Sequence, residues 1–548
     1  MEIGKKAYET LRRERFVEKS VRFSSTIHRT NLKSFLTIHK PEKENTVTSS
    51  GKKKEDAQMR RSIEVARARG RNMEELLQYD VSPTSYLFDQ EGLMTKPQKS
   101  TLIQDLEANL TSDDERVPTK DSDLQTAFIA DVMANIRKIK TNDIQTFGEF
   151  CEQFLDYISV VGRGQDRLDL VFDSYVEGSI KDSERNWRQD KAPIEMNIIH
   201  YDTPLPVEMA RFWSSSNNKL KLQMLLHKQA MKRGIENPST VHVVASFFSG
   251  ASDSVKCKGV MNGNSVEIPD LCTEVEEADA RIIPHALHSV RSGMQRIVVL
   301  SGDTDVFVLL VHYWDILSSE GLRELWIRAG VGDSTRYIPV HILAPRIGKE
   351  LCYLLPLVHT LTGCDYTSKV GTKHAALIAN PTEYLKDFDA GPRCTDDFTA
   401  SCEAYLVQVF KRNTTCTTMD QLRDYIYHHS KGVSLNMLPP TSNAVQEHIH
   451  RAYYATYQMV TLLQPHKPTL LNPIAFGFKK TDELLLPVKG VKPIPEEYTI
   501  LCNCKKCSNG RCACRKAGLP CISFCKCQSL QGVEEAVQCQ NPSGSIKG

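Results

Sequence analysis

Residues 296–310 read RIVVLSGDTDVFVLL, and this stretch decides the fold. A short apolar run favours a buried strand, and a polar turn with Asp303 and Asp305 follows it directly. Two other apolar runs also end in an aspartate, TAFIAD at Asp131 and LDLVFD at Asp173. In an open α/β sheet, ligands bind outside the carboxyl ends of the parallel strands. The three runs therefore predict an α/β fold whose parallel sheet gathers carboxylates at one edge.

One aspartate after a strand would mean little, because Asp is also a common helix N-cap. Two further acidic elements extend the pattern: EEAD at 276–279 opens an amphipathic helix, and Asp365 follows the apolar run LCYLLPLVHTL. Seven unpaired carboxylates would repel one another strongly. Mg²⁺ or Mn²⁺, hard cations that prefer oxygen ligands, resolve that conflict. The candidate catalytic residues are Asp131, Asp173, Glu277, Asp279, Asp303, Asp305 and Asp365.

The order and wording of these elements resemble the flap endonuclease and XPG group of 5′-nucleases, within the wider PIN-like fold. The resemblance spans about residues 124–390 and rests on IADVMA, LVFDSY, EEADAR, SGDTDV and GCDYTSKVGTKHAAL. The wording of these motifs resembles still more closely that of animal proteins, often associated with mobile elements, that join such a core to a C-terminal cysteine module. The resemblance implies a PIN-like parallel sheet flanked by helices.

The same resemblance implies a hydrolase that binds two Mg²⁺ or Mn²⁺ ions and cuts phosphodiester bonds. Basic residues on the helix after VFD help to bind the scissile phosphate in that family, and Lys181 and Arg185 stand at similar spacing here. The family's Gly-rich GIGPK hairpin is replaced by KVGTKH. The interval before EEAD includes NNKLKLQMLLHKQAMKRG, which is either a strand-contacting helix or a solvated amphipathic one.

The C-terminal region carries cysteines at the spacing C-x-C-x₂-C-x₄-C-x-C-x₆-C-x₃-C-x-C. Thiolates bind Zn²⁺ tetrahedrally, and so short a segment needs metal ligation to fold. Nine of the chain's 17 cysteines crowd here, which in a reducing compartment argues for metal over disulfides. The predicted zinc ligands are Cys502, Cys504, Cys507, Cys512, Cys514, Cys521, Cys525, Cys527 and Cys539.

This spacing resembles the CXC domain of tesmin-type proteins, which implies three zinc ions with bridging sulfurs and DNA binding. Between Cys502 and Cys527 there are six basic residues and no acidic one, which would attract phosphates. A structural zinc knot or a protein-interaction module is the alternative, because zinc modules serve both purposes.

Length and composition set the remaining expectations. The chain has 548 residues and a formal net charge of +2, so it should form several domains, and any basic surface must be local. The charged N-terminus lacks an apolar signal region and no stretch approaches a membrane span, which predicts an intracellular protein and, with DNA as partner, a nuclear one. The expected divisions are an accessory region at 1–120, a nuclease core at 121–390, a helical subdomain at 391–465, a linker at 466–497 and a CXC zinc module at 498–542.

Together these observations predict a structure-selective DNA nuclease tethered to DNA by its zinc module. Two alternatives stay open. The core can be a PIN-like fold without chemistry, so that the protein is a DNA-binding or chromatin scaffold, or it can be a PIN-like ribonuclease. Dispersal of the carboxylates, or their pairing with Lys and Arg, would favour the scaffold.

Overall fold

The computed structural model divides the chain into two compact units, Met1–Lys43 and Glu44–Gly548. The residues it describes are 8–20, 61–80, 86–89, 91–118, 123–173, 180, 194–197, 199–247, 255–272, 275, 277–429, 438–464, 471–481, 484–529 and 539–544. In the first unit a short helical segment, η1, covers Arg13–Val17. All other named elements belong to the second unit.

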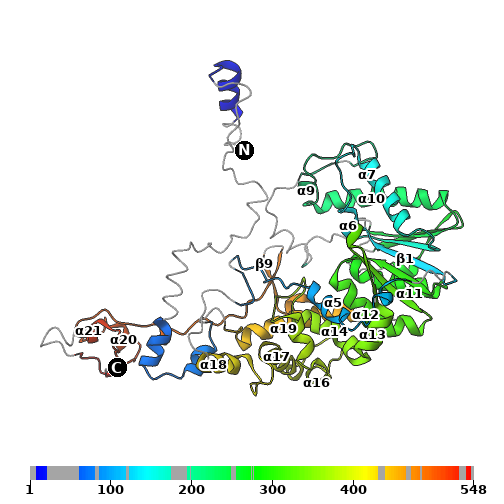
Figure 1. Ribbon diagram of the computed structural model, residues 1–548. Helices are drawn as coiled ribbons and strands as arrows, with labels where there is room; N and C mark the ends of the chain where they lie inside the picture. The colour runs from blue at the N-terminus through cyan, green and yellow to red at the C-terminus, as the bar shows by residue number, and fades with distance from the viewer. Residues whose placement is uncertain are drawn as a thin grey trace. The chain divides into compact units, whose positions relative to one another are not determined.

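An eight-stranded sheet lies at the centre of the second unit, in the order β5-β4-β3-β2-β1-β6-β7-β8 (Figure 1). The five central strands pair in parallel, and β4, β5 and β8 add antiparallel edges. The predicted α/β class is confirmed as a mostly parallel sheet flanked by helices, whereas the antiparallel edges were not predicted. The strands are β1 Thr126–Asp131, β2 Arg167–Val171, β3 Val241–Phe247, β4 Val255–Met261, β5 Asn264–Glu267, β6 Arg296–Leu300, β7 Glu324–Ala329 and β8 Arg336–Pro339.

Helices cover both faces of this sheet (Figure 1). One face carries α6 Val132–Ile136, α7 Phe147–Val161, α9 Met209–Phe212 and α10 Ser216–Glu236. The other carries α5 Ser100–Glu107, α11 Ala278–Arg291, α12 Thr304–Ser319, α13 Val340–Ile347 and part of α14 Lys349–Leu361.

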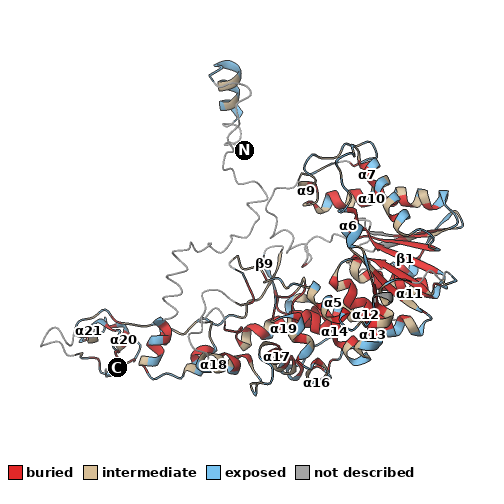
Figure 2. Ribbon diagram, viewed as in Figure 1, coloured by how far each residue is buried: buried red, intermediate tan, exposed pale blue. Residues whose placement is uncertain are grey.

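Alternate side chains of β1 face the two layers of helices. Ala127 and Ile129 belong to the core shared with α11 and α12, while Phe128 and Ala130 belong to the core shared with α7 and α10. This is the two-residue period of a strand. Because β1 has β2 on one side and β6 on the other, it is buried throughout, as its red ribbon in Figure 2 shows.

A third core joins α14 to the helices that follow it. Helical periodicity predicted helices in the stretch 391–465, and α17, α18 and α19 occupy it. Residues 466–497, which we expected to be a linker, include a two-stranded hairpin whose Phe478 is buried against these helices. The elements are α15 Lys373–Ile378, α16 Pro381–Tyr384, α17 Asp396–Phe410, α18 Met419–His429, α19 Ser442–Val460, β9 Phe478–Thr481 and β10 Leu484–Pro487.

The stretch before β1 takes part in the same cores. Leu102, Ile103 and Leu106 of α5 are buried against α11 and α12. Upstream of α5, the amide N of Lys369 donates to the carbonyl of Thr95 at 2.7 Å, which ties residues 86–97 to the loop after α14. Nothing in the sequence indicated that this part of the predicted accessory region would lie beside the carboxylates.

The cysteine-rich region contains two short helices, α20 Ala513–Lys516 and α21 Lys526–Ser529, between loops that carry the thiols. Residues 61–68 are helical and lie next to it, and α4 covers Met73–Leu77. Among the helices that the structure describes, none is both long enough and apolar enough to cross a membrane.

Candidate functional site

Three adjacent parallel strands bring three of the predicted carboxylates to one edge of the sheet. Strand β1 ends at Asp131, β2 leads into Asp173, and β6 leads into Asp303. Since β1 lies between β2 and β6, these three side chains occupy neighbouring positions at the carboxyl ends of the strands. This is the position at which α/β folds bind ligands.

Two of these aspartates are also helix N-caps. Asp131 Oδ1 accepts from the amide N of Ala134 at 3.0 Å and so begins α6, and Asp303 Oδ1 accepts from the amide N of Asp305 at 2.9 Å at the start of α12. The capping role and the acidic cluster are therefore compatible. Each cap uses one carboxylate oxygen and leaves the other available.

Burial and the charges of neighbouring carboxylates raise the pKa values of Asp131 and Asp303. Burial, and after it the negative charge of Asp173, raises the pKa of Asp131 to about 7. Burial and the charge of Asp305 likewise raise the pKa of Asp303 to about 6. Among the described residues, neither Asp131, Asp173 nor Asp303 forms an ion pair with Lys or Arg. A divalent cation would relieve that repulsion.

The acidic start of α11 is tied to the end of β2. The amide N of Ala278 donates to Asp173 Oδ1 at 3.1 Å. Glu277, the N-cap residue of α11, accepts a short hydrogen bond from the hydroxyl of Tyr366. Asp279 lies one position inside the first turn of α11. Glu277 thereby joins the cluster through Tyr366, next to Asp365.

The last two carboxylates, Asp305 and Asp365, share a lysine that the sequence did not point to. Lys99 Nζ lies 3.0 Å from Asp305 Oδ2 and 2.8 Å from Asp365 Oδ1. Burial alone would lower the pKa of Lys99, but the charges of Asp305 and Asp365 outweigh it and raise that pKa above its usual value. Lys99 stands in KPQKS, a stretch with no motif, so only the fold reveals its place.

Two buried residues extend the cluster from Asp305: His359 contacts Asp305, and Lys373 contacts His359. His359 Nε2 is 2.8 Å from Asp305 Oδ1, and Lys373 Nζ is 3.2 Å from His359 Nδ1. Lys373 also donates to the carbonyls of His359 and Gly363, both at 2.7 Å. Burial lowers the pKa of His359 to about 4 and that of Lys373 to about 7. The ring is thus neutral near pH 7, and its Nε2 proton faces Asp305.

The carboxylate oxygens do not form a tight ligand cage. Within the part of the chain that the structure describes, every set of three or more ligand atoms lying within 4.8 Å of one another consists of cysteine sulfurs. Mg²⁺ is usually bound through one or two carboxylates, several waters and substrate phosphates. The donor set fits such an open site on the side of Asp131, Asp173 and Asp303, which form no ion pair with the lysines and arginines that the structure describes.

The predicted phosphate-binding residues Lys181 and Arg185 lie outside the described residues. The basic helix α10 is described, and several of its cations have structural contacts. Lys221 Nζ donates to the carbonyl of Met196 at 2.7 Å, and Arg233 pairs with Glu152 and Asp156 of α7. These contacts favour a helix packed on the core over one that contacts a threaded strand.

His285 and Cys364, which we interpreted as packing residues, are both buried. His285 Nδ1 lies 2.7 Å from Asp169 Oδ2, in a buried network in which Arg167 also pairs with Asp169. This network ties α11 to β2 and holds the helix that carries Glu277 and Asp279.

Eight of the nine predicted zinc ligands come together in the cysteine-rich region. Their sulfurs form three overlapping groups of four, and Cys502 belongs to all three. Cys507 and Cys521 are each shared by two groups. Cys539 is in none of them, although it packs against the cluster. The buried cluster can hold a metal ion such as zinc, and the shared sulfurs suit bridging thiolates. The groups are Cys502, Cys507, Cys521 and Cys527; Cys502, Cys504, Cys507 and Cys512; and Cys502, Cys514, Cys521 and Cys525.

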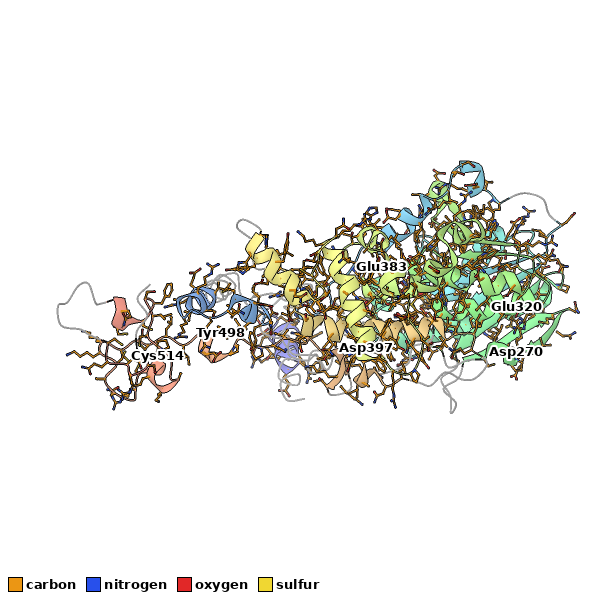
Figure 3. All side chains as sticks on the ribbon, turned by 90° about the horizontal axis from the view of Figure 1, so that it is seen from below. Asp270, Glu320, Glu383, Asp397, Tyr498 and Cys514 are labelled. Carbon is orange, nitrogen blue, oxygen red and sulfur yellow. The ribbon has the colours of Figure 1, made fainter. Side chains whose placement is uncertain are left out.

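The helix at 61–68 contacts both the cysteine cluster and the helical core. Val65 is buried among the cysteines, while Ile63 and Ala66 pack with Tyr498. Arg69, just beyond the helix, donates short hydrogen bonds to the carbonyls of Glu497 and Ile500. Figure 3 labels Tyr498 and Cys514 on the C-terminal stretch that this helix contacts.

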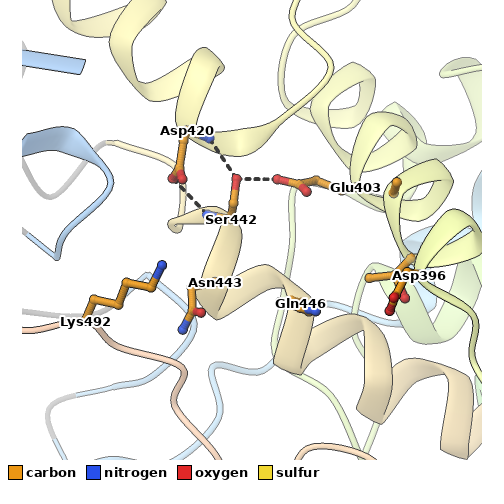
Figure 4. Close-up of a pocket in the computed structure, with 9 residues that line it drawn as sticks. Asp396, Glu403, Asp420, Ser442, Asn443, Gln446 and Lys492 are labelled. Atoms are coloured by element: carbon orange, nitrogen blue, oxygen red, sulfur yellow. Dashed lines mark hydrogen bonds between the residues drawn. The ribbon is translucent and has the colours of Figure 1, made fainter. Parts of the chain in front are cut away.

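A separate open pocket lies where α17, α18 and α19 meet (Figure 4). Ser442 Oγ donates to Glu403 Oε1 at 2.5 Å, and the amide N of Asp420 donates to Ser442 Oγ at 3.1 Å. The amide N of Ser442 in turn donates to Asp420 Oδ1 at 2.9 Å. These hydrogen bonds join the starts of α18 and α19 to α17, so the polar lining of the pocket serves to hold the helices together.

No family model and no curated protein matches this chain.

Proposed function

We propose that this chain is a metal-dependent nuclease that hydrolyses DNA phosphodiesters at the acidic edge of a PIN-like core. The observation that supports this most is the placement of Asp131, Asp173 and Asp303 at the ends of adjacent parallel strands, where burial and the charges of Asp173 and Asp303 raise the pKa of Asp131. Buried carboxylates that repel one another at a ligand-binding edge are typical of sites that hold a divalent cation.

In this proposal the carboxylates bind the divalent cation and keep one another in position. Asp131, Asp173 and Asp303 would hold Mg²⁺ or Mn²⁺, and Glu277 and Asp279 would add negative charge beside them at the start of α11. A bound divalent ion supplies an activated water and stabilises the leaving oxygen in phosphodiester hydrolysis. His359 fixes the rotamer of Asp305 through its Nε2 proton, since it is wholly buried and cannot itself reach a substrate.

The cysteine module supports DNA as the substrate. Its basic residues lie on the loops and short helices around the buried thiols, and all but the half-buried Arg515 are exposed. Exposed cations bind phosphate backbones through counterion release. A role at DNA would place the protein in the nucleus. The basic residues are Lys505, Lys506, Arg511, Arg515, Lys516 and Lys526.

One observation favours the second candidate, a DNA-binding scaffold without catalysis. Asp305 and Asp365 are already paired with Lys99, and pairing with lysine is the feature expected of a carboxylate cluster that has lost its metal. Asp131, Asp173 and Asp303 favour the nuclease, because they lie at neighbouring strand ends and form no ion pair with a described Lys or Arg. Only a measurement of cleavage separates the two candidates.

The test is cleavage of end-labelled 5′-flap, bubble and single-stranded DNA, and of single-stranded RNA, by the zinc-loaded full chain with Mg²⁺ or Mn²⁺. The control is the Asp303→Asn/Asp305→Asn variant, which keeps both side-chain shapes. DNA cleavage by the wild type that disappears in the control supports the nuclease. Binding of DNA without cleavage in either metal supports the scaffold, and cleavage of RNA alone supports the ribonuclease.

A further inference from the structure

We infer that the Lys99 ammonium occupies the place of a second metal ion, so that the site takes one divalent cation where related chemistry uses two. This inference rests on the proposed function and deepens it. It separates the acidic cluster into two parts with different counter-charges. Asp131, Asp173 and Asp303 would bind the metal ion, whereas Asp305 and Asp365 form ion pairs with Lys99.

The contacts of Lys99 are those of a bridging cation. Its Nζ contacts both oxygens of Asp305, at 3.2 and 3.0 Å, and Asp365 Oδ1 at 2.8 Å. The side chain is 19% exposed and that of Asp305 13%, so water screens the pair weakly. A divalent ion at the same point would require the ammonium to leave, because two cations cannot share these oxygens at contact distance.

The backbone holds Lys99 in this position. Lys99 is the N-cap residue of α5, and Leu102, Ile103 and Leu106 anchor that helix in the core. The hydrogen bond from Lys369 to Thr95 fixes the chain just before it. The ammonium therefore projects into the cluster from a rigid support.

The helix itself does not favour a lysine there. The N-terminus of a helix carries partial positive charge, which disfavours a cation. The ion pairs with Asp305 and Asp365 must outweigh this unfavourable interaction with the helix. The two carboxylates, and not α5, therefore explain why a lysine stands at this position. The charge of Lys99 also lowers the pKa of Asp303.

A single divalent ion matches the remaining donors. With Lys99 in place, Asp131, Asp173 and Asp303 at the ends of β1, β2 and β6 form no ion pair with Lys or Arg among the described residues. An ion held there through one or two carboxylates and waters needs no tight cage. Lys99 then supplies the second positive charge at a fixed point, as a positioning residue for Asp305 and Asp365.

The test is the number of Mn²⁺ ions bound per chain, counted by electron paramagnetic resonance and by calorimetry on the zinc-loaded full chain. The variants are Lys99→Met, which keeps the stem and removes the charge, Lys99→Arg, which keeps the charge, and Lys386→Met as a control at an exposed lysine. We expect one ion in the wild type, in Lys99→Arg and in Lys386→Met, and two in Lys99→Met. The Lys99→Met/Asp365→Asn variant, which restores the charge balance, should bind one.

Two ions in the wild type, or one ion in a folded Lys99→Met variant, would overturn the inference while the nuclease proposal stands. Binding of no Mn²⁺ by the wild type would overturn both. The number of Mn²⁺ ions bound by the wild type tests the inference by itself, so the test holds even if Lys99→Met does not fold.

Discussion

His359 Nε2 lies 2.8 Å from Asp305 Oδ1, and the histidine that makes this contact is wholly buried. The ring is neutral near pH 7 because burial lowers the pKa of His359 to about 4. A neutral ring with its proton on Nε2 is a directional donor, and it sets the orientation of the carboxylate. Asp305 is therefore held by two contacts, a hydrogen bond from His359 and an ion pair with Lys99.

Replacing His359 should impair catalysis without removing a group that touches substrate. For His359→Ala we expect kcat to fall by roughly 10- to 100-fold, the usual effect of removing an outer-shell partner, with little change in KM for DNA. His359→Gln, which can still donate to Asp305, should recover most of the rate. Steady-state cleavage kinetics of the three proteins check this. A rise in KM with unchanged kcat would show that His359 acts on substrate binding instead.

Metal affinity should depend on pH through Asp131 and Asp303. Their pKa values are raised to about 7 and about 6, so in the metal-free protein both bind protons at about pH 5.5 and release them by about pH 7.5. Protons and metal compete for these oxygens, and the apparent Mn²⁺ affinity should rise by roughly tenfold or more over that interval. Calorimetric titration across this range measures it. An affinity independent of pH would mean that the ion binds elsewhere.

The same shifts predict a direction for stability. A carboxyl whose pKa is raised on folding stabilises the folded state below its ordinary pKa and loses that contribution as pH rises through the folded-state value. The metal-free wild type should therefore lose stability relative to Asp303→Asn between about pH 4 and about pH 6. Asn keeps the N-cap of α12, so the difference reports the charge. Thermal melting of both proteins against pH checks the sign.

Gly371 in KVGTKH has a structural role that can be measured. Its φ of +62° favours glycine, and a Cβ there would lie 2.5 Å from Val409 Cγ1 of α17. Gly371→Ala should destabilise the core by about 2 kcal/mol or more, from backbone strain and overpacking together. Gly164→Ala is the matched control, because φ is +82° there and a Cβ would meet open space. Equal losses in thermal stability would show that the contact with Val409 is unimportant.

The cysteine groups predict unequal roles for two thiols. Cys502 belongs to all three groups of four sulfurs, whereas Cys539 belongs to none. Cys502→Ser should lose most of the bound zinc, and Cys539→Ser should retain it. Val65 packs among the cysteines, so zinc removal should also expose residues 61–68 to protease. Elemental analysis and limited proteolysis check both points. Equal zinc loss in the two variants would show that nine thiolates act together.

The sequence allowed the sheet edge to be predicted because its signal is local. The apolar runs before Asp131, Asp173 and Asp303 predict both a strand and the carboxylate that follows it. Cysteine spacing is equally local, and it identified eight thiols that do come together. The edge strand β8 has a weaker signal, because its exposure breaks the apolar run.

Lys99, His359 and Lys373 could not be predicted in the same way. Each lies in a different segment, and each acquires its role only when α5, α14 and α15 meet beside the first turn of α12. A lysine in KPQKS or a histidine in LVHTL has no spacing that distinguishes it from a surface or packing residue. Their contacts depend on tertiary structure, which sequence periodicity does not encode.

The most direct test of the nuclease is the single-turnover rate of 5′-flap DNA cleavage with Mg²⁺ by the wild type and by Asp131→Asn. Asn keeps the hydrogen bond to Ala134 that begins α6 and removes the need to bury a charge, so the variant should fold. We predict cleavage by the wild type and a loss of at least about 100-fold in the variant, while zinc content and DNA affinity are unchanged. Equal rates in the two proteins, or no cleavage by the wild type, would contradict the assignment of this carboxylate edge as a nuclease site.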